Sequence, residues 1–251
     1  MNRRRWVDAV AIALAVAVVA GLGFAMRPQS TARMTVQPST VSIERPQPAQ
    51  KEHPSVLYIG DSYTFGQGAA EMSYACMAAR RLDWFCHLAA LPGTGYISGG
   101  PANRFLVNPY LGISTSFIER IPHLAAVYEP DVVVFDGGRN DLLAPSEDVF
   151  KAMVAAIEEA RQVWPAAKIV VIRPRFLARP GDDLGYDDGF FERLASSVRG
   201  VAIVDPIYTL ADIDTAPMLI KDGIHPNARG ELAITAPLVK SLAPLDLGVP
   251  T

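Results

Sequence analysis

The chain has 251 residues, half of them hydrophobic, and a formal net charge of −3, which is typical of an ordinary globular protein. Four arginines against one aspartate give residues 1–30 a charge of +3 and leave −6 for the rest. An acidic body without a lysine or arginine cluster argues against a nucleic-acid-binding surface, and four histidines without ligand spacing argue against a metal centre.

Residues 1–26 are predicted to be a targeting segment. Arg3, Arg4 and Arg5 precede an uncharged apolar run at residues 9–26, and such a basic flank stays on the cytoplasmic side of a membrane. A signal-peptide core has about 7–15 residues and a membrane span about 20. The run therefore fits either an uncleaved anchor helix or a signal peptide cut after Ala25, and both place the rest of the chain outside the cytoplasm.

Residues 27–54 are expected to form a solvated, disordered linker. Prolines recur among Ser, Thr and Gln, and few large apolar residues are available to bury. The remaining residues, 55–251, are enough for one domain. We expect this domain to be a monomer that the linker holds clear of a membrane or threads into a cell-wall layer.

From residue 56 onward, short apolar runs alternate with longer amphipathic ones, a pattern typical of βαβ units and a parallel sheet. Strands are predicted at residues 56–59, 84–89, 132–135, 169–172 and 201–204. Helices are predicted at residues 69–81, 115–128, 146–164, 187–198 and 227–242. Pro237 should kink or divide the last helix. The predicted fold class is α/β, with a five-stranded parallel sheet between two layers of helices.

Two long connections interrupt this rhythm, at residues 91–114 and 173–186. Long loops in a compact domain often carry function, and aromatic residues in these two suggest a partly apolar cleft. They are Tyr96, Phe105, Tyr110 and Phe176. The acidic run at residues 181–188 does not have the spacing of an EF-hand calcium loop, so a solvated acidic loop is expected.

The predicted export favours a disulfide between the two cysteines, Cys76 and Cys86, because disulfides persist in oxidising compartments. We expect them to form a disulfide. The alternative is a pair of buried thiols, which are common in protein cores. Catalysis by cysteine is disfavoured, since His87 beside Cys86 would point to the opposite face of a strand.

A hydroxyl group stands directly after the first predicted strand, in Gly60-Asp61-Ser62. The carboxyl ends of strands are where open α/β sheets bind ligands, so Ser62 is a candidate nucleophile. An ordinary strand-ending turn is the alternative, because all three residue types favour turns.

A serine nucleophile needs a base, and His225 is the best candidate of the four histidines. It lies three residues after Asp222, within reach of a carboxylate that could fix its tautomer. The alternative is a helix-capping turn with Asn227 as the cap. The other histidines, His53, His87 and His123, are expected to be structural or solvated.

Two further turns could supply hydrogen-bond donors to an oxyanion. Gly138-Arg139-Asn140-Asp141 follows the third strand and offers the Asn140 amide, and Gly93 follows the second strand and offers a backbone N–H. In a parallel sheet, these turns open onto the same edge as Ser62 and His225. In the strand order 2-1-3-4-5, Ser62 and Asn140 also flank the point where a crevice must form.

These motifs together resemble those of the SGNH hydrolases, also called GDSL-type esterases and lipases. The resemblance covers residues 56–242 and rests on Gly60-Asp61-Ser62 with Thr64 and Gly66, on Gly93, on Gly138 to Asp141, and on Asp222 with His225. It implies a flavodoxin-like SGNH-hydrolase fold and a Ser62–His225–Asp222 triad. It also implies an oxyanion hole made by the Ser62 N–H, the Gly93 N–H and the Asn140 side chain. Tyr63 stands where the family name expects leucine, and we expect it to shape the substrate pocket with Tyr96.

The predicted function is that of an exported serine esterase, acting on a lipid or an O-acylated glycan near the cell envelope without a cofactor or metal. Acyl transfer to an envelope glycan remains open, because a sugar hydroxyl can replace water at the same triad. A surface-anchored binding protein that has lost activity is a further alternative. The expected partners are the ester substrate and, if the first segment is uncleaved, the membrane.

Overall fold

The computed structural model describes residues 53–66, 68–99, 115–186 and 189–245, all within one compact unit that spans Gln50–Thr251. The targeting segment and most of the linker, residues 1–52, lie outside the described residues, as do Phe105 and Tyr110. In the part of the chain that is described, no helix is both long enough and apolar enough to cross a membrane.

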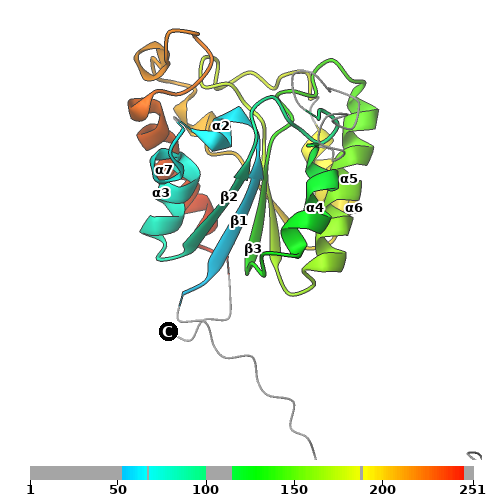
Figure 1. Ribbon diagram of the computed structural model, residues 1–251. Helices are drawn as coiled ribbons and strands as arrows, with labels where there is room; N and C mark the ends of the chain where they lie inside the picture. Colours follow the sequence, from blue (N-terminus) through cyan, green and yellow to red (C-terminus); the bar gives the residue numbers. More distant parts are fainter. Residues whose placement is uncertain (1–52, 67, 100–114, 187–188, 246–251) are drawn as a thin grey trace, which may run out of the picture. The chain divides into compact units, whose positions relative to one another are not determined.

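Five parallel strands form one sheet in the order β2-β1-β3-β4-β5 (Figure 1), which confirms the predicted fold class and strand order. The strands are β1 (Ser55–Gly60), β2 (Phe85–Ala90), β3 (Val132–Asp136), β4 (Lys168–Ile172) and β5 (Val201–Val204). Gly60 pairs with both Ala90 and Asp136, so the carboxyl ends of the three strands are level. The loops that follow these strands therefore meet at one edge.

Helices cover both faces of the sheet (Figure 1). On one face lie α3 (Tyr74–Arg81) and α7 (Ala228–Leu242), and on the other α4 (Phe117–Ala125), α5 (Ser146–Val163) and α6 (Phe190–Ser197). Because side chains alternate along a strand, Leu57 and Ile59 pack in one apolar cluster with α4, α5 and α6, while Val56 and Tyr58 pack in the other with α3 and α7. Burial on both faces explains why the central strands β1, β3 and β4 are nearly continuous apolar runs.

The prediction of one continuous helix at residues 69–81 was wrong. A short 3₁₀ turn, η1 (Ala70–Met72), comes first, and α3 begins only after Ser73. The Ser73 side chain accepts a hydrogen bond from the Ala75 N–H and donates one to the Thr64 carbonyl. A serine that caps one helix and bonds a distant loop interrupts an otherwise helical pattern.

Other helix boundaries differ from the prediction by a few residues. Helix α6 begins at Phe190, after Gly189 in a left-handed conformation (φ +100°). The last helix, α7, is not divided at Pro237, and Asn227 caps its first turn. Two further 3₁₀ turns, η2 (Tyr208–Leu210) and η3 (Ala216–Met218), occupy the connection between β5 and α7.

Residues 181–185 of the acidic loop are exposed or half-buried, as expected of a solvated loop, and one aspartate also pairs with two arginines. Asp183 lies 2.9 Å from an Arg173 guanidinium nitrogen and 3.1 Å from one of Arg175. Arg175 Nε also donates to both carboxylate oxygens of Asp205, which directly follows β5, at 2.9 and 2.8 Å. These ion pairs fasten the connection after β4 to the carboxyl end of β5.

Candidate active site

Ser62 is placed by a sharp turn at the end of β1. Asp61 caps the short helix α2 (Ser62–Phe65), because its carboxylate accepts a hydrogen bond from the Tyr63 N–H at 2.8 Å. A Cβ at Gly60 would lie only 2.0 Å from the Thr64 hydroxyl oxygen. The turn therefore needs glycine at residue 60, and it leaves Ser62 at the carboxyl edge of the sheet.

The structure brings Ser62, His225 and Asp222 together. His225 Nε2 lies 2.8 Å from Ser62 Oγ, and His225 Nδ1 lies 2.6 Å from Asp222 Oδ2. The hydrogen bond from His225 is the largest cause that lowers the pKa of Asp222, to about 2. A charged Asp222 holds the proton on Nδ1, which leaves Nε2 free to accept the Ser62 hydroxyl proton.

The same segment is also a helix-capping turn, so both interpretations of its sequence hold. Asp222 Oδ1 accepts hydrogen bonds from the Ile224 and His225 backbone N–H groups at 2.8 and 3.0 Å. Asn227 accepts hydrogen bonds from the Arg229 and Gly230 N–H groups at 2.9 and 3.1 Å and starts α7. The turn that begins the helix is therefore the scaffold of the histidine.

Two backbone N–H groups in the turns after β1 and β2, those of Ser62 and Gly93, have no protein acceptor among the described residues. Gly93 has φ +77°, a conformation that favours glycine. Asn140 Nδ2 donates one hydrogen to the Thr94 carbonyl at 2.9 Å, and its second hydrogen remains for a ligand.

Asp141, the last residue of the Gly138–Asp141 motif, fixes the loop that carries Gly93. Its carboxylate accepts hydrogen bonds from three successive N–H groups, those of Tyr96 (2.8 Å), Ile97 (3.1 Å) and Ser98 (2.8 Å). A Cβ at Gly95 would lie 2.3 Å from Asp141 Oδ2, so only glycine fits there. Sequence reasoning missed this role, although the aspartate was in the motif.

A buried ion cluster that the sequence did not reveal lies under the nucleophile. An Arg139 guanidinium nitrogen lies 3.2 Å from Asp61 and 3.0 Å from Asp136. Asp136 also accepts hydrogen bonds from the hydroxyls of Thr64, at 2.8 Å, and Tyr74. Burial opposes the charge of Arg139, but the two carboxylates outweigh burial and hold the pKa of Arg139 well above its usual value. The cluster therefore keeps a charged arginine beneath α2.

The two tyrosines predicted to shape the substrate pocket are instead buried, which corrects that prediction. Tyr63 and Tyr96 each have 1% of their surface exposed. Tyr96 packs its ring against Phe117 and Phe135, with ring centroids 4.8 and 6.0 Å apart. The sequence could not show this, because exposure at the edge of a sheet depends on long-range packing.

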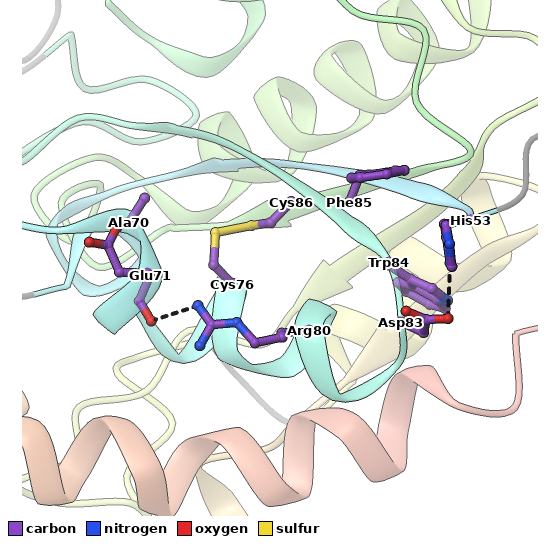
Figure 2. A pocket seen from close by; sticks show the side chains of 9 residues that line it. All are labelled: His53, Ala70, Glu71, Cys76, Arg80, Asp83, Trp84, Phe85 and Cys86. Carbon is purple, nitrogen blue, oxygen red and sulfur yellow. Dashed lines mark hydrogen bonds and ion pairs between the residues drawn. A yellow bond between two sulfur atoms is a disulfide. The ribbon is translucent and has the colours of Figure 1, made fainter.

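Cys76 of α3 and Cys86 of β2 are joined by a disulfide. The bridge lies beside a cavity of about 420 Å³, which is also lined by Trp84 and Phe85 (Figure 2). Ser62 and its partners are not among the residues that line this cavity. This cavity is therefore separate from the candidate catalytic residues. Among the described residues, no group of three or more acidic, histidine or cysteine side chains could hold a metal ion.

The other histidines lie away from the nucleophile, and two of them have neighbours of their own. His53 Nδ1 lies 2.9 Å from Asp83, and the His87 ring, on β2, packs against Tyr128 with centroids 4.6 Å apart. His123 lies in the last turn of α4. None of the three is hydrogen-bonded to Ser62 in the described structure, where His225 holds that position.

Exposed apolar side chains stand within three residues of the site residues in the chain. They are Phe65, Leu91, Leu142, Leu143, Ile220 and Ile224, with Leu143 the most exposed at 75%. Large apolar side chains at the rim of a site are available to bury an apolar part of a ligand.

Comparisons with known proteins match most of the chain to one family and to one curated relative. A family model described as the GDSL-like lipase/acylhydrolase family matches residues 58–233. The GDSL lipase Rv0518 of Mycobacterium tuberculosis is 29% identical over 189 residues, which cover 70% of this chain and 75% of that protein.

Solved esterase structures have a similar fold. The psychrotrophic esterase EstA from a Pseudoalteromonas species is 16% identical with a TM-score of 0.57, covering 76% of this chain and 97% of that one. A carbohydrate acetylesterase from Sinorhizobium meliloti is 18% identical with a TM-score of 0.57, covering 76% and 98%.

Proposed function

Since this chain belongs to the GDSL-like lipase/acylhydrolase family, we propose that it is a serine esterase that hydrolyses acyl esters with Ser62, His225 and Asp222. The observation that carries the proposal is the pair of hydrogen bonds on His225, 2.8 Å to Ser62 and 2.6 Å to Asp222. This is the geometry in which an imidazole acts as a general base on a serine hydroxyl.

The reaction follows from these contacts. His225 Nε2 takes the Ser62 proton as Oγ attacks the ester carbonyl, and the charge that develops on the carbonyl oxygen is stabilised by the Ser62 N–H, the Gly93 N–H and the Asn140 amide. The tetrahedral intermediate collapses, and the alcohol leaves with the proton from His225. Water, activated by the same histidine, then releases the acid and restores the serine.

We infer that the acyl group is apolar. The support is the set of exposed apolar side chains that flank the site residues in the chain, such as Phe65 and Leu91. Each buried methylene contributes up to about 0.8 kcal/mol, which is about a fourfold gain in binding. The relative from Mycobacterium tuberculosis is named a lipase, in line with this inference.

We also propose that the chain acts outside the cytoplasm. Arg3, Arg4 and Arg5 before the apolar run at residues 9–26 support export. The disulfide between Cys76 and Cys86 adds support, since such bonds persist mainly in oxidising compartments.

The proposal is tested by hydrolysis of p-nitrophenyl esters from acetate to octanoate with the full-length chain. We expect kcat/KM to rise with acyl length, and the Ser62→Ala variant to lose all enzymatic turnover. An inactive wild-type protein, or a Ser62→Ala variant with undiminished turnover, would contradict the proposal. If a glycan acceptor is added and acylated glycan replaces the free acid, the enzyme transfers acyl groups rather than releasing them to water.

A further inference from the structure

Tyr63, the residue after the nucleophile, turns its side chain into the protein and links two loops. Its hydroxyl donates a hydrogen bond to the Ile224 carbonyl at 2.5 Å and accepts one from the Leu177 N–H at 3.0 Å. Ile224 directly precedes His225. The phenol therefore joins the nucleophile helix α2 to the backbone that carries the base.

The histidine loop has few other attachments near its tip. At its base, Leu219 and Pro226 form an antiparallel bridge, and the Asn227 N–H donates to the Met218 carbonyl at 2.8 Å. Within the tip, residues 220–225, the backbone N–H groups of Ile220, Gly223, Ile224 and His225 donate only to acceptors of the tip itself. Among the described residues, two hydrogen bonds tie the tip to the rest of the protein, one from Ser62 to His225 and one from Tyr63 to Ile224.

One of these two bonds is lost during the reaction. When Ser62 Oγ carries the acyl group it has no proton to donate, so its hydrogen bond to His225 cannot form in the acyl-enzyme. The Tyr63 hydroxyl then makes the one remaining hydrogen bond that holds the tip beside the ester, at the stage when His225 must activate water.

The environment of Tyr63 keeps this bond in place. The Arg139 guanidinium lies 4.2 Å from the centre of the Tyr63 ring, and the same arginine pairs with Asp61 on the other side of Ser62. Burial is the main cause that raises the pKa of Tyr63, to about 12, so the hydroxyl keeps its proton at neutral pH. Because the Leu177 N–H already donates to the phenol oxygen, the phenol proton is directed to Ile224.

We propose that the Tyr63 hydroxyl is a positioning group that holds His225 in place for the deacylation step. The proposal rests on the esterase function proposed above. A leucine, which the GDSL name expects after the serine, could make neither hydrogen bond, so this linkage belongs to the tyrosine found here.

The test compares Tyr63→Phe with Tyr58→Phe in the full-length chain. Tyr58 is a matched control, because it is fully buried in the same apolar cluster and its hydroxyl has no hydrogen-bond partner among the described residues. Each variant loses one buried hydroxyl and keeps its ring. Thermal unfolding is recorded for both, and kinetics are measured well below the unfolding transitions.

For Tyr63→Phe we expect kcat to fall about tenfold, because the variant loses the one hydrogen bond that holds the tip in the acyl-enzyme. We expect kcat/KM to change less than threefold, because Ser62 still holds His225 in the free enzyme. Rapid mixing should show a burst of about one p-nitrophenol per enzyme as the acyl-enzyme accumulates. Tyr58→Phe should behave as wild type.

Other outcomes overturn the inference. A Tyr63→Phe kcat within twofold of the wild-type value would show that the hydroxyl does not position His225 for turnover. An equal fall in kcat and kcat/KM without a burst would show that the hydroxyl does not act specifically in deacylation. Both results leave the esterase function standing, since the wild-type enzyme is active in each. An inactive wild type would instead overturn the proposed function and this inference together.

Discussion

At the residue scale, both neighbours of Ser62 in the chain point inward and are held by one arginine. Arg139 pairs with Asp61 and lies over the Tyr63 ring. The serine between them is thereby fixed from two sides, while its own hydroxyl faces His225. Preorganisation of this kind reduces the reorganisation that the transition state requires.

Another buried carboxyl group, Glu231 of α7, should make stability depend on pH. One oxygen accepts a hydrogen bond from the Tyr74 N–H at 2.8 Å, and the other has no partner among the described residues. Burial is the main cause that raises the pKa of Glu231 from 4.5 to about 8, against the effect of that hydrogen bond. Between these pH values the folded state binds a proton that the unfolded chain has lost. The free energy of unfolding should therefore fall as pH rises, by up to about 1.4 kcal/mol per pH unit.

The Glu231→Gln variant tests this dependence. An amide can accept the Tyr74 hydrogen bond and does not ionise, so urea unfolding at pH 5 and pH 8 should show a smaller loss of stability than in wild type. Glu192→Gln, at an exposed position of α6, should keep the wild-type dependence. Equal pH dependence in wild type and Glu231→Gln would refute the assignment.

Contacts between residues close together in the chain could be predicted from the sequence, and contacts between distant residues could not. Asp222 and His225 lie three residues apart, so their contact was visible in the motif. The partners of Arg139 and Tyr63 were not, because Arg139 meets Asp61 across 78 residues and Tyr63 meets Ile224 across 161. Tyr63 was predicted to shape the substrate pocket, but its side chain is buried.

At the element scale, the central strands were predicted well because burial on both faces requires continuous apolar runs. Helix ends were predicted less well. Ser73 divides the predicted helix at residues 69–81 through a hydrogen bond to the Thr64 carbonyl. No local sequence pattern indicates such a contact.

The disulfide should contribute to the stability of the fold. It joins α3 to the edge strand β2 across ten positions of the chain. The Cys76→Ser/Cys86→Ser variant should lose about 2–3 kcal/mol of unfolding free energy, because the unfolded chain gains the freedom of the opened loop. Reductant should lower the stability of wild type by a similar amount and leave the double variant unchanged. Two free thiols in the unreduced wild-type protein would refute the bridge.

At the scale of the whole molecule, the level carboxyl ends of β1, β2 and β3 explain why turns far apart in sequence form one site. The alternation of apolar and amphipathic segments was enough to predict this sheet. The substrate class was not predictable in the same way, since the exposure of side chains such as Leu143 depends on the packing of complete loops.

Export is the remaining prediction for the whole chain. When the full-length protein is expressed in a bacterial host, added protease should digest the domain in spheroplasts, and deletion of residues 1–26 should protect it inside the cell. Mass spectrometry distinguishes an intact anchor from a chain cut after Ala25. A full-length domain that resists protease until the cells are lysed would contradict export.

The central claim is that Ser62 is a nucleophile activated by His225. It is tested most directly by treating the full-length protein with a fluorophosphonate probe and locating the label by mass spectrometry of its peptides. We predict one label per chain, on Ser62, with labelling abolished in Ser62→Ala and greatly slowed in His225→Ala. A label on another residue, or unchanged labelling of the Ser62→Ala variant, would contradict the account.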